Sequence, residues 1–186
     1  MIIYIVGISC VGKTTIGKML AEQIDVKFYD LDVEVEKYYK KSIERIQNEC
    51  FMINEFFEKA SVVLDNILSN SDNAVIAGAP SGLRLMYWNT IKKHKRKREI
   101  ITIHIRDSHE NIFNRLTFYD IDSKPIVVEI DEEKKKKYLK RIKADYNYFK
   151  KSYERADVEI NIENVSLDEI PNLIIQELNK MNVIVN

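Results

Sequence analysis

Five short apolar runs along the chain predict the strands of a buried sheet. They lie at residues 2–6, 26–29, 74–77, 100–105 and 158–162. Short runs rich in Ile, Val and Ala are typical of strands whose two faces are both covered. We therefore expect a sheet that lies inside the molecule rather than at its surface.

Segments with the periodicity of an α-helix lie between these runs. In two of them apolar side chains recur at spacings of three and four residues, which predicts helices with one buried face. The first stripe consists of Ile16, Met19, Leu20 and Ile24, and the second of Ile53, Phe56, Ala60, Val63, Leu64 and Ile67. Strands that alternate with helices are joined by crossovers, so the pattern predicts an α/β fold with a parallel sheet and helices on both faces.

The last helix has a start signal in the sequence. Ser166 and Glu169 have the spacing of a capping box, in which each side chain binds a free backbone N–H of the first turn. The apolar stripe after them consists of Ile170, Leu173, Ile174 and Leu178. We expect the helix to open at Ser166 and to tolerate Pro171 in an early turn.

The composition indicates one globular domain without a strongly charged surface. The chain has 186 residues, of which 45% are hydrophobic, enough to fill the core of a single domain spanning residues 1–186. Lys plus Arg and Asp plus Glu both number 29, which excludes a general attraction to nucleic acid or anionic membranes. No segment resembles a membrane span or a signal peptide. Cys10 and Cys50 cannot form a disulfide framework, so we expect a soluble cytoplasmic protein.

A glycine-containing loop follows the first predicted strand directly. Residues 7–14 read Gly-Ile-Ser-Cys-Val-Gly-Lys-Thr and match the pattern G-x-x-x-x-G-K-[ST] between a strand and a helix. The two glycines allow a turn whose backbone N–H groups point inward, at the positive end of the following helix. Such a nest binds anions. The residues expected to contact a nucleotide here are Gly7, Ser9, Cys10, Val11, Gly12, Lys13, Thr14 and Thr15.

Two side chains of this loop carry the chemistry expected of it. Lys13 can bridge the β and γ phosphates of a nucleotide, and the Thr14 hydroxyl can hold Mg²⁺. The alternative is a tight glycine turn before a helix that binds no ligand. We expect the chain to bind a nucleoside triphosphate together with Mg²⁺.

The residues that follow the loop resemble those of the shikimate kinases, a family of P-loop kinases. In that family the loop continues as T-[IV]-G-[RK]-x-L-A, followed by F-x-D-x-D and then by S-I. This chain has Thr15, Ile16, Gly17, Lys18, Leu20 and Ala21, then Phe28, Asp30 and Asp32, then Ser42 and Ile43. The resemblance is strong over the first 43 residues and looser beyond them. It implies a three-layer P-loop NTPase fold with a small lid at about residues 116–128, and ATP as the phosphate donor.

The resemblance implies roles for four residues outside the loop. In the family, the second acid of F-x-D-x-D, here Asp32, contacts the acceptor hydroxyl and the water shell of Mg²⁺ and is a candidate base, while Asp30 supports the metal. Arg115 stands where a family arginine packs on adenine, and Lys124 where a lid arginine closes on the phosphates. Lys124 can neutralise charge but cannot form the paired hydrogen bonds of an arginine. The alternatives are solvated acids at a strand end and, for Arg115, a solvated helix residue.

The acceptor side of the predicted site departs from the family pattern. Where the family has two arginines that bind the carboxylate of shikimate, this chain has Phe56 and Tyr148. The family's G-G-G turn, whose backbone approaches the acceptor and the γ phosphate, reads Gly78, Ala79 and Pro80. Proline has no N–H to donate. The expected acceptor site comprises Asp32, Phe56, Gly78, Ala79 and Tyr148.

These departures leave the identity of the acceptor open. The loss of two charge-assisted contacts, each worth about 1.5–3 kcal/mol, disfavours shikimate and favours a neutral or aromatic hydroxylated acceptor. Arg45, Arg84 and Arg141 could replace the missing cations, but the spacing selects none of them. Phe56 fits core packing on its helix equally well.

The sequence favours one function over two others. We expect an ATP-dependent small-molecule kinase in which Lys13, Asp32 and Lys124 act on the transferred phosphate and its acceptor. The alternative is a nucleotide-binding regulatory module that has lost phosphotransfer, which Lys124 and the Gly-Ala-Pro turn suggest. The basic run at residues 92–98 could contact nucleic acid, although such a run at a helix end is more typical of a solvated surface. The expected partners are ATP and a small hydroxylated acceptor, with no membrane.

Overall fold

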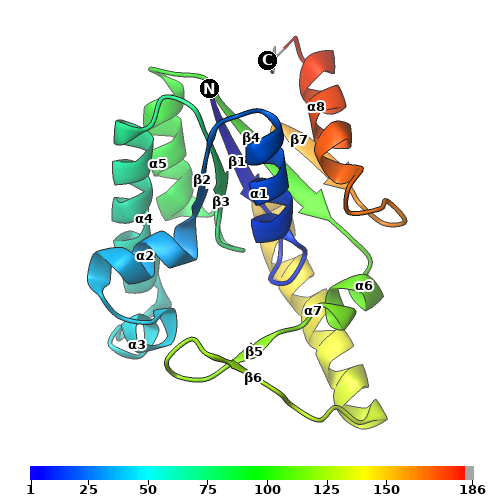
Figure 1. Cartoon of the computed structure of the whole chain (residues 1–186). Coiled ribbons are helices and arrows are strands. Elements are labelled where there is room, and N and C mark those ends of the chain that lie inside the picture. The colour runs from blue at the N-terminus through cyan, green and yellow to red at the C-terminus, as the bar shows by residue number, and fades with distance from the viewer. Residues whose placement is uncertain (183–186) are drawn as a thin grey trace.

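The computed structural model describes residues 1–182 and contains a sheet of five parallel strands. The strands are β1 (Ile2–Val6), β2 (Lys27–Asp30), β3 (Ala74–Ala77), β4 (Ile100–Arg106) and β7 (Val158–Asn161). Their order across the sheet is β2-β3-β1-β4-β7, with β1 at the centre (Figure 1). The five predicted strands are therefore confirmed, with ends that differ by no more than one residue.

Helices cover both faces of this sheet. α1 (Lys13–Gln23) and α8 (Ile170–Lys180) pack together in front of the sheet in Figure 1. α4 (Ile53–Asn70) and α5 (Leu85–Lys95) pack against each other on the other side, and the long α7 (Glu132–Tyr153) passes behind the sheet. Every residue of β1 is at most 1% exposed, as expected for a strand between two layers of helices. Within residues 1–182, no helix has both the length and the apolar character needed to cross a membrane.

Shorter elements surround the carboxyl ends of the strands. α2 (Leu31–Tyr39) and α3 (Ile43–Asn48) follow β2, and α6 (His109–Asn114) follows β4. Between α6 and α7, the strands β5 (Phe118–Tyr119) and β6 (Pro125–Ile126) form an antiparallel hairpin, which we call the lid hairpin. Figure 1 shows that this hairpin reaches across the end of the sheet toward α3. It lies within the segment that the sequence proposes as a lid.

The last helix begins later than the sequence indicates. α8 starts at Ile170, and the Glu169 side chain before it makes no capping hydrogen bond. The Ser166 hydroxyl instead donates to the Glu169 carboxylate at 2.5 Å, so the two side chains bond to each other rather than to backbone N–H groups. The capping-box prediction is therefore wrong. Pro171 does lie in the first turn, where its missing N–H removes no helical hydrogen bond.

The basic run at residues 92–98 is partly bound to the rest of the protein. Lys93 and His94 both contact the carboxylate of Asp65 on α4, at 2.9 and 2.8 Å. Lys95 forms a further ion pair with the residue before β7, which is described next. These contacts give the end of α5 a structural role, because they hold it against neighbouring elements.

Asp157 fixes the edge strand β7 to its neighbour β4. Its carboxylate accepts hydrogen bonds from the backbone N–H and the hydroxyl of Thr102, both at 2.7 Å, and forms an ion pair with Lys95 at 2.5 Å. Desolvation raises the pKa of Asp157, but the hydrogen bonds from Lys95 and Thr102 outweigh it and hold the pKa below its usual value. The folded state therefore favours the charged carboxylate.

We expect Asp157→Asn to lower the free energy of unfolding at pH 7 by about 1–2 kcal/mol, because an amide cannot pair with Lys95 or accept the same hydrogen bonds. A carboxyl group with a depressed folded-state pKa contributes stability above its unfolded pKa and loses it as the pH falls. The difference between wild type and variant should therefore shrink below about pH 4. Urea unfolding at pH 7 and pH 3 measures both values.

The matched control is Asp168→Asn, which changes an exposed acid in the turn before α8. This variant should be as stable as the wild type at both pH values. An equal loss of stability in the control would contradict the role given to Asp157.

Candidate active site

The phosphate loop joins the end of β1 to the start of α1. Gly12 precedes α1 with a φ of 106°, a backbone conformation that residues with side chains rarely adopt. The ammonium group of Lys13 donates to the carbonyl oxygens of Gly7 and Ile8, both at 3.0 Å. The first N–H groups of a helix have no partner within it and suit an anion. The loop thus combines amide donors and a cation at one helix start.

Asp30 links the phosphate loop to the neighbouring helix α2. Its Oδ2 accepts a hydrogen bond from the Thr14 hydroxyl at 2.6 Å. Its Oδ1 accepts from the backbone N–H groups of Asp32 and Val33, at 3.1 and 3.4 Å, so Asp30 is the N-cap of α2. This cap places Asp32 in the first turn of α2, next to the phosphate loop.

A cavity of about 510 Å³ lies between the phosphate loop, the start of α2, the loop after β3 and the lid hairpin. Most of its lining residues are those that the sequence predicts: Ser9, Cys10, Gly12, Lys13, Thr14, Thr15, Asp30, Asp32, Gly78 and Arg115. Ala77, Pro80, Thr117 and Tyr119 complete the lining. The cavity therefore brings most of the predicted phosphate and metal residues together with two of the five predicted acceptor residues, Asp32 and Gly78.

Charges of opposite sign share this cavity. Asp32 lines the cavity and is exposed. Desolvation and the nearby carboxylate of Asp30 raise the pKa of Asp32 to about 6, and Lys13 opposes this shift. Desolvation lowers the pKa of Lys13, and Asp32 is the strongest of the charges that oppose it. A carboxyl group that titrates near pH 6 can accept a proton from a hydroxyl at neutral pH.

Arg115 lines both this cavity and a second one of about 430 Å³. Its guanidinium pairs with the buried carboxylate of Asp107 and donates to the carbonyl of Cys10 at 3.2 Å. Asp107 also accepts from the side-chain amide of Asn111 at 2.8 Å. The phosphate loop, the start of α1, the segment before α8 and Asn111 of α6 also line the second cavity. Arg115 is thus held in place where the two cavities meet.

Six residues predicted for the site do not line the first cavity. Two belong to the phosphate loop, namely Gly7 and Val11, and Val11 lines the second cavity. The other four lie outside the loop. Phe56 is only 4% exposed and packs in the core, with its ring 6.1 Å from that of Phe57. Ala79 is also buried, whereas Tyr148 is 63% exposed on α7. Lys124 lies in the turn of the lid hairpin. α4 directs Phe56 inward with the rest of its apolar stripe, which is the core role that the sequence left open.

Besides Ala77 at the end of β3, the predicted site left out four residues that contribute to it. Thr117 and Tyr119 lie within the predicted lid, but nothing in the local pattern marks either of them as a lining residue. Pro80 lines the cavity although it has no N–H to offer a ligand. Asp107 directly follows β4, so the rule that ligands bind at the carboxyl ends of parallel strands could have found it.

The residues around Thr14 suit a hard divalent cation. Thr14 supplies a hydroxyl oxygen, and Asp30 and Asp32 supply carboxylate oxygens at the same cavity wall. Mg²⁺ prefers oxygen ligands, keeps several waters, and is commonly held by one or two carboxylates and the phosphates of its nucleotide. Within residues 1–182, no group of three or more His, Cys, Asp or Glu side chains forms a metal site. The donor set therefore fits Mg²⁺ that arrives with a nucleotide.

Comparison with known proteins shows what this site and fold are similar to. The family model for shikimate kinase matches residues 9–179. A shikimate kinase of Persephonella marina is 30% identical over 173 residues, which cover 93% of this chain and 96% of that protein. One of Flavobacterium johnsoniae is 26% identical over 171 residues, with 90% and 92% covered. The solved structure of shikimate kinase from Acinetobacter baumannii in complex with shikimate matches with a TM-score of 0.75 at 19% identity, covering 98% of this chain and 95% of that one. This likeness confirms the expected P-loop NTPase fold.

We expect Asp32→Asn to stabilise the protein at pH 8 but not at pH 3. The pKa of Asp32 is higher in the folded state than in the unfolded state, so the stability that is fully present below the unfolded pKa of about 4 is lost as the pH rises to about 6. An uncharged amide escapes this loss. Thermal unfolding should therefore give the variant a higher Tm than the wild type at pH 8 only. The same difference at both pH values would show that ionisation of Asp32 is not its cause.

Proposed function

The chain belongs to the shikimate kinase family of ATP-dependent kinases, and we propose that it phosphorylates shikimate or a closely related hydroxylated ring acid. The observation that carries this proposal is the single cavity that Lys13, Thr14 and Asp32 line together. The two relatives described above are named shikimate kinases, and the Acinetobacter baumannii enzyme was solved in complex with shikimate. The alternative of a regulatory module without phosphotransfer finds no support in these relatives.

Phosphoryl transfer in this cavity depends on position and on charge. The acceptor hydroxyl oxygen attacks the γ phosphorus, the bond from that phosphorus to the bridging oxygen breaks, and ADP leaves. Lys13 neutralises the phosphates, while Asp32 orients the hydroxyl and takes its proton. Mg²⁺, when bound, neutralises further charge on the phosphates. With a pKa of about 6, Asp32 is ionised at neutral pH, as a base must be.

The adenosine part of ATP fits the second cavity. Gly12 and Thr15 of the phosphate loop line both cavities, so a nucleotide bound to this loop can extend from one into the other. Arg115 also lines both and is held by its ion pair with Asp107. Its planar guanidinium can pack on the base while its charge faces the phosphates.

Lys124 of the lid hairpin is the cation proposed to approach the transferred phosphate. Its backbone N–H donates to Oδ1 of Asp120 at 2.9 Å, which fixes its place in the lid turn. Thr117 and Tyr119, from the same part of the chain, line the cavity. With the hairpin docked over the cavity, reorientation of the Lys124 side chain would bring its ammonium group toward the phosphates, and the hairpin would exclude water from the reaction.

Arg84 is the best candidate to bind the acid group of the acceptor. Its guanidinium carbon lies 4.6 Å from the centroid of the Tyr148 ring, beside one of the two positions where the family pattern has an arginine. Of the other candidates, Arg45 is paired with Asp122 and Arg141 is exposed on α7. A guanidinium at this place favours an acidic acceptor over the neutral one that the sequence suggests.

Contacts with α7 and the residues after it fix the loop that carries Arg84. The Tyr153 hydroxyl donates to the carbonyl of Pro80 at 2.9 Å, and Arg155 donates to the carbonyl of Leu83 at 2.7 Å. Pro80 lines the cavity, and Arg84 is the residue that precedes α5. The same loop therefore lines the cavity at one end and carries the cation at the other.

ADP release from Mg-ATP tests the proposed function. We expect turnover with shikimate, and a loss of at least about 10²-fold in Asp32→Asn with ATP binding retained, because the carboxylate acts on the acceptor hydroxyl. The rate without acceptor is the baseline for both proteins. The proposal fails if neither shikimate nor related hydroxy acids raise ADP release above this baseline.

The methyl ester of shikimate tests the role of Arg84. A charge-assisted hydrogen bond is worth about 1.5–3 kcal/mol, so the wild type should have at least about tenfold higher kcat/KM for the acid than for the ester. Arg84→Gln should remove this preference and leave activity on the ester unchanged, whereas the matched control Arg141→Gln should keep it. A wild type that prefers the ester would have a neutral acceptor, and equal losses on both compounds would exclude Arg84 from acid recognition.

A further inference from the structure

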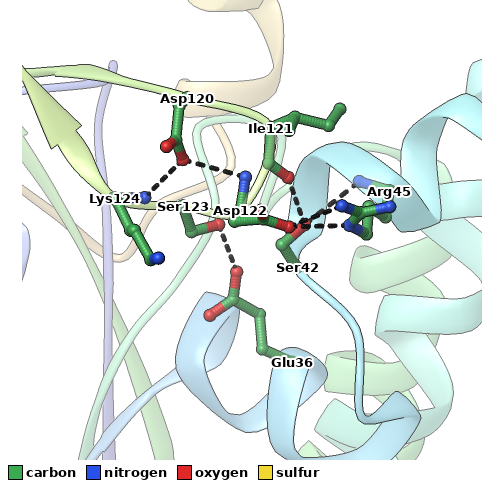
Figure 2. Close-up of polar contacts among 8 residues, drawn as sticks. All are labelled: Glu36, Ser42, Arg45, Asp120, Ile121, Asp122, Ser123 and Lys124. Carbon is green, nitrogen blue, oxygen red and sulfur yellow. Dashed lines mark hydrogen bonds and ion pairs between the residues drawn. The ribbon is translucent and has the colours of Figure 1, made fainter.

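The tip of the lid hairpin, residues 120–124, is docked on the segment that follows α2. Figure 2 shows the contacts, which join parts of the chain far apart in sequence. The Ser42 hydroxyl donates to the carbonyl of Ile121 at 2.6 Å. Arg45, in α3, forms an ion pair with Asp122 at 2.7 Å. The lid tip is therefore bound through both a backbone carbonyl and a charged side chain.

A third contact joins the lid tip to the helix that carries Asp32. The Ser123 hydroxyl donates to Oε1 of Glu36 at 2.6 Å (Figure 2). The same oxygen accepts the backbone N–H of Ile43 at 2.9 Å. Glu36 lies four residues after Asp32 in α2, so the two carboxyl groups share one side of the helix. The lid tip thus touches the side of α2 on which Asp32 lies.

The lid tip is a turn held by its own hydrogen bonds. Oδ1 of Asp120 accepts from the backbone N–H groups of Asp122 and Lys124, both at 2.9 Å (Figure 2). Ser123 has a left-handed φ of 59°, and its N–H donates to the carbonyl of Asp120 at 3.1 Å. A turn that is preformed in this way moves as a unit. Docking of its tip therefore fixes the position of the whole hairpin.

We infer that Glu36, Ser42 and Arg45 form a latch that holds the lid hairpin over the cavity. They are positioning residues, because they touch the lid tip and none of the three lines the cavity. An engaged latch keeps the hairpin's cavity-lining residues in place and ties Lys124 to the same helix as Asp32. Only the effect of the latch on turnover rests on the proposed function.

The latch is weak enough to open in each catalytic cycle. The side chains of Arg45 and Asp122 are 52% and 47% exposed, and ion pairs this exposed contribute little. The hydrogen bonds of Ser42 and Ser123 add to this pair. Together the three contacts should favour the closed hairpin about ten- to a hundredfold. Substrates can then enter through an open minority, and closure follows without large rearrangement.

Cleavage of the lid hairpin by chymotrypsin tests the latch in the absence of any substrate. The hairpin offers Phe118 and Tyr119 as cleavage sites, and neither is altered in the variants. When opening is fast, the cleavage rate follows the population of the open state. We expect Ser123→Ala combined with Arg45→Gln to raise the initial rate about tenfold, and each single change about threefold.

The matched control for this experiment is Lys41→Gln. It breaks an exposed ion pair with Glu49 close to the latch in sequence, at 2.7 Å, without touching the lid tip, and should leave cleavage unchanged. Charge reversal gives the second comparison, because Asp122→Arg should slow the cleavage of Arg45→Asp back toward the wild-type rate. Unchanged cleavage in the Ser123→Ala and Arg45→Gln double variant, or no recovery after reversal, would overturn the latch.

Steady-state kinetics test whether the latch positions the lid for catalysis. The double variant should show a KM for Mg-ATP and shikimate raised about threefold or more, with kcat changed less, because its lid is open for a larger fraction of time. Faster cleavage with unchanged KM values would refute the positioning role. If the wild type shows no kinase activity, the proposed function fails, while the cleavage rates still decide whether the latch exists.

Discussion

The carboxylate of Asp30 holds the two halves of the site together. One oxygen accepts the hydroxyl of Thr14 from the phosphate loop, and the other caps α2. The cap fixes the first turn of α2 and with it Asp32, while the bond to Thr14 orients the hydroxyl that suits Mg²⁺. Because α2 continues to Glu36, the same cap also sets where the lid tip docks. The nucleotide, acceptor and lid residues therefore share one reference point, which a transfer that depends on alignment requires.

This arrangement places like charges together, and the rest of the fold has to compensate for it. Burial and the carboxylate of Asp30 disfavour the ionised form of Asp32, although a base must be ionised. Lys13 offsets part of this repulsion, and its own charge is disfavoured by burial. The opposite holds at the edge strand, where Asp157 is stabilised in its charged form. A functional site is expected to contain groups whose charged form is destabilised, whereas the charged form of groups elsewhere can be stabilised, because activity and stability place different demands on a side chain.

The local sequence pattern was sufficient to predict the strands of the sheet and the phosphate loop, because each of these features depends on residues that are close together in sequence. The same logic failed at Ser166, where spacing could not tell whether the hydroxyl would bond to a backbone N–H or to the Glu169 carboxylate. The latch could not be predicted at all, since Ser42 and Ile121 are 79 residues apart. Whether a side chain lines a cavity also depends on the rotation of its helix about the helix axis. The stripe that contains Phe56 fits a core face and a site position equally well until the neighbouring layer is known.

On the acceptor side, the motif position of an arginine and the place where a guanidinium lies in the structure are different things. Phe56 packs in the core with the apolar face of α4 and does not line the cavity. Tyr148 is exposed and offers the face of its ring to Arg84, which comes from a different element. An arginine needs only to bring its guanidinium to the carboxylate of a ligand, whichever element supplies it. A missing arginine in a motif is therefore weak evidence against an acidic acceptor when another guanidinium is held close to the same place.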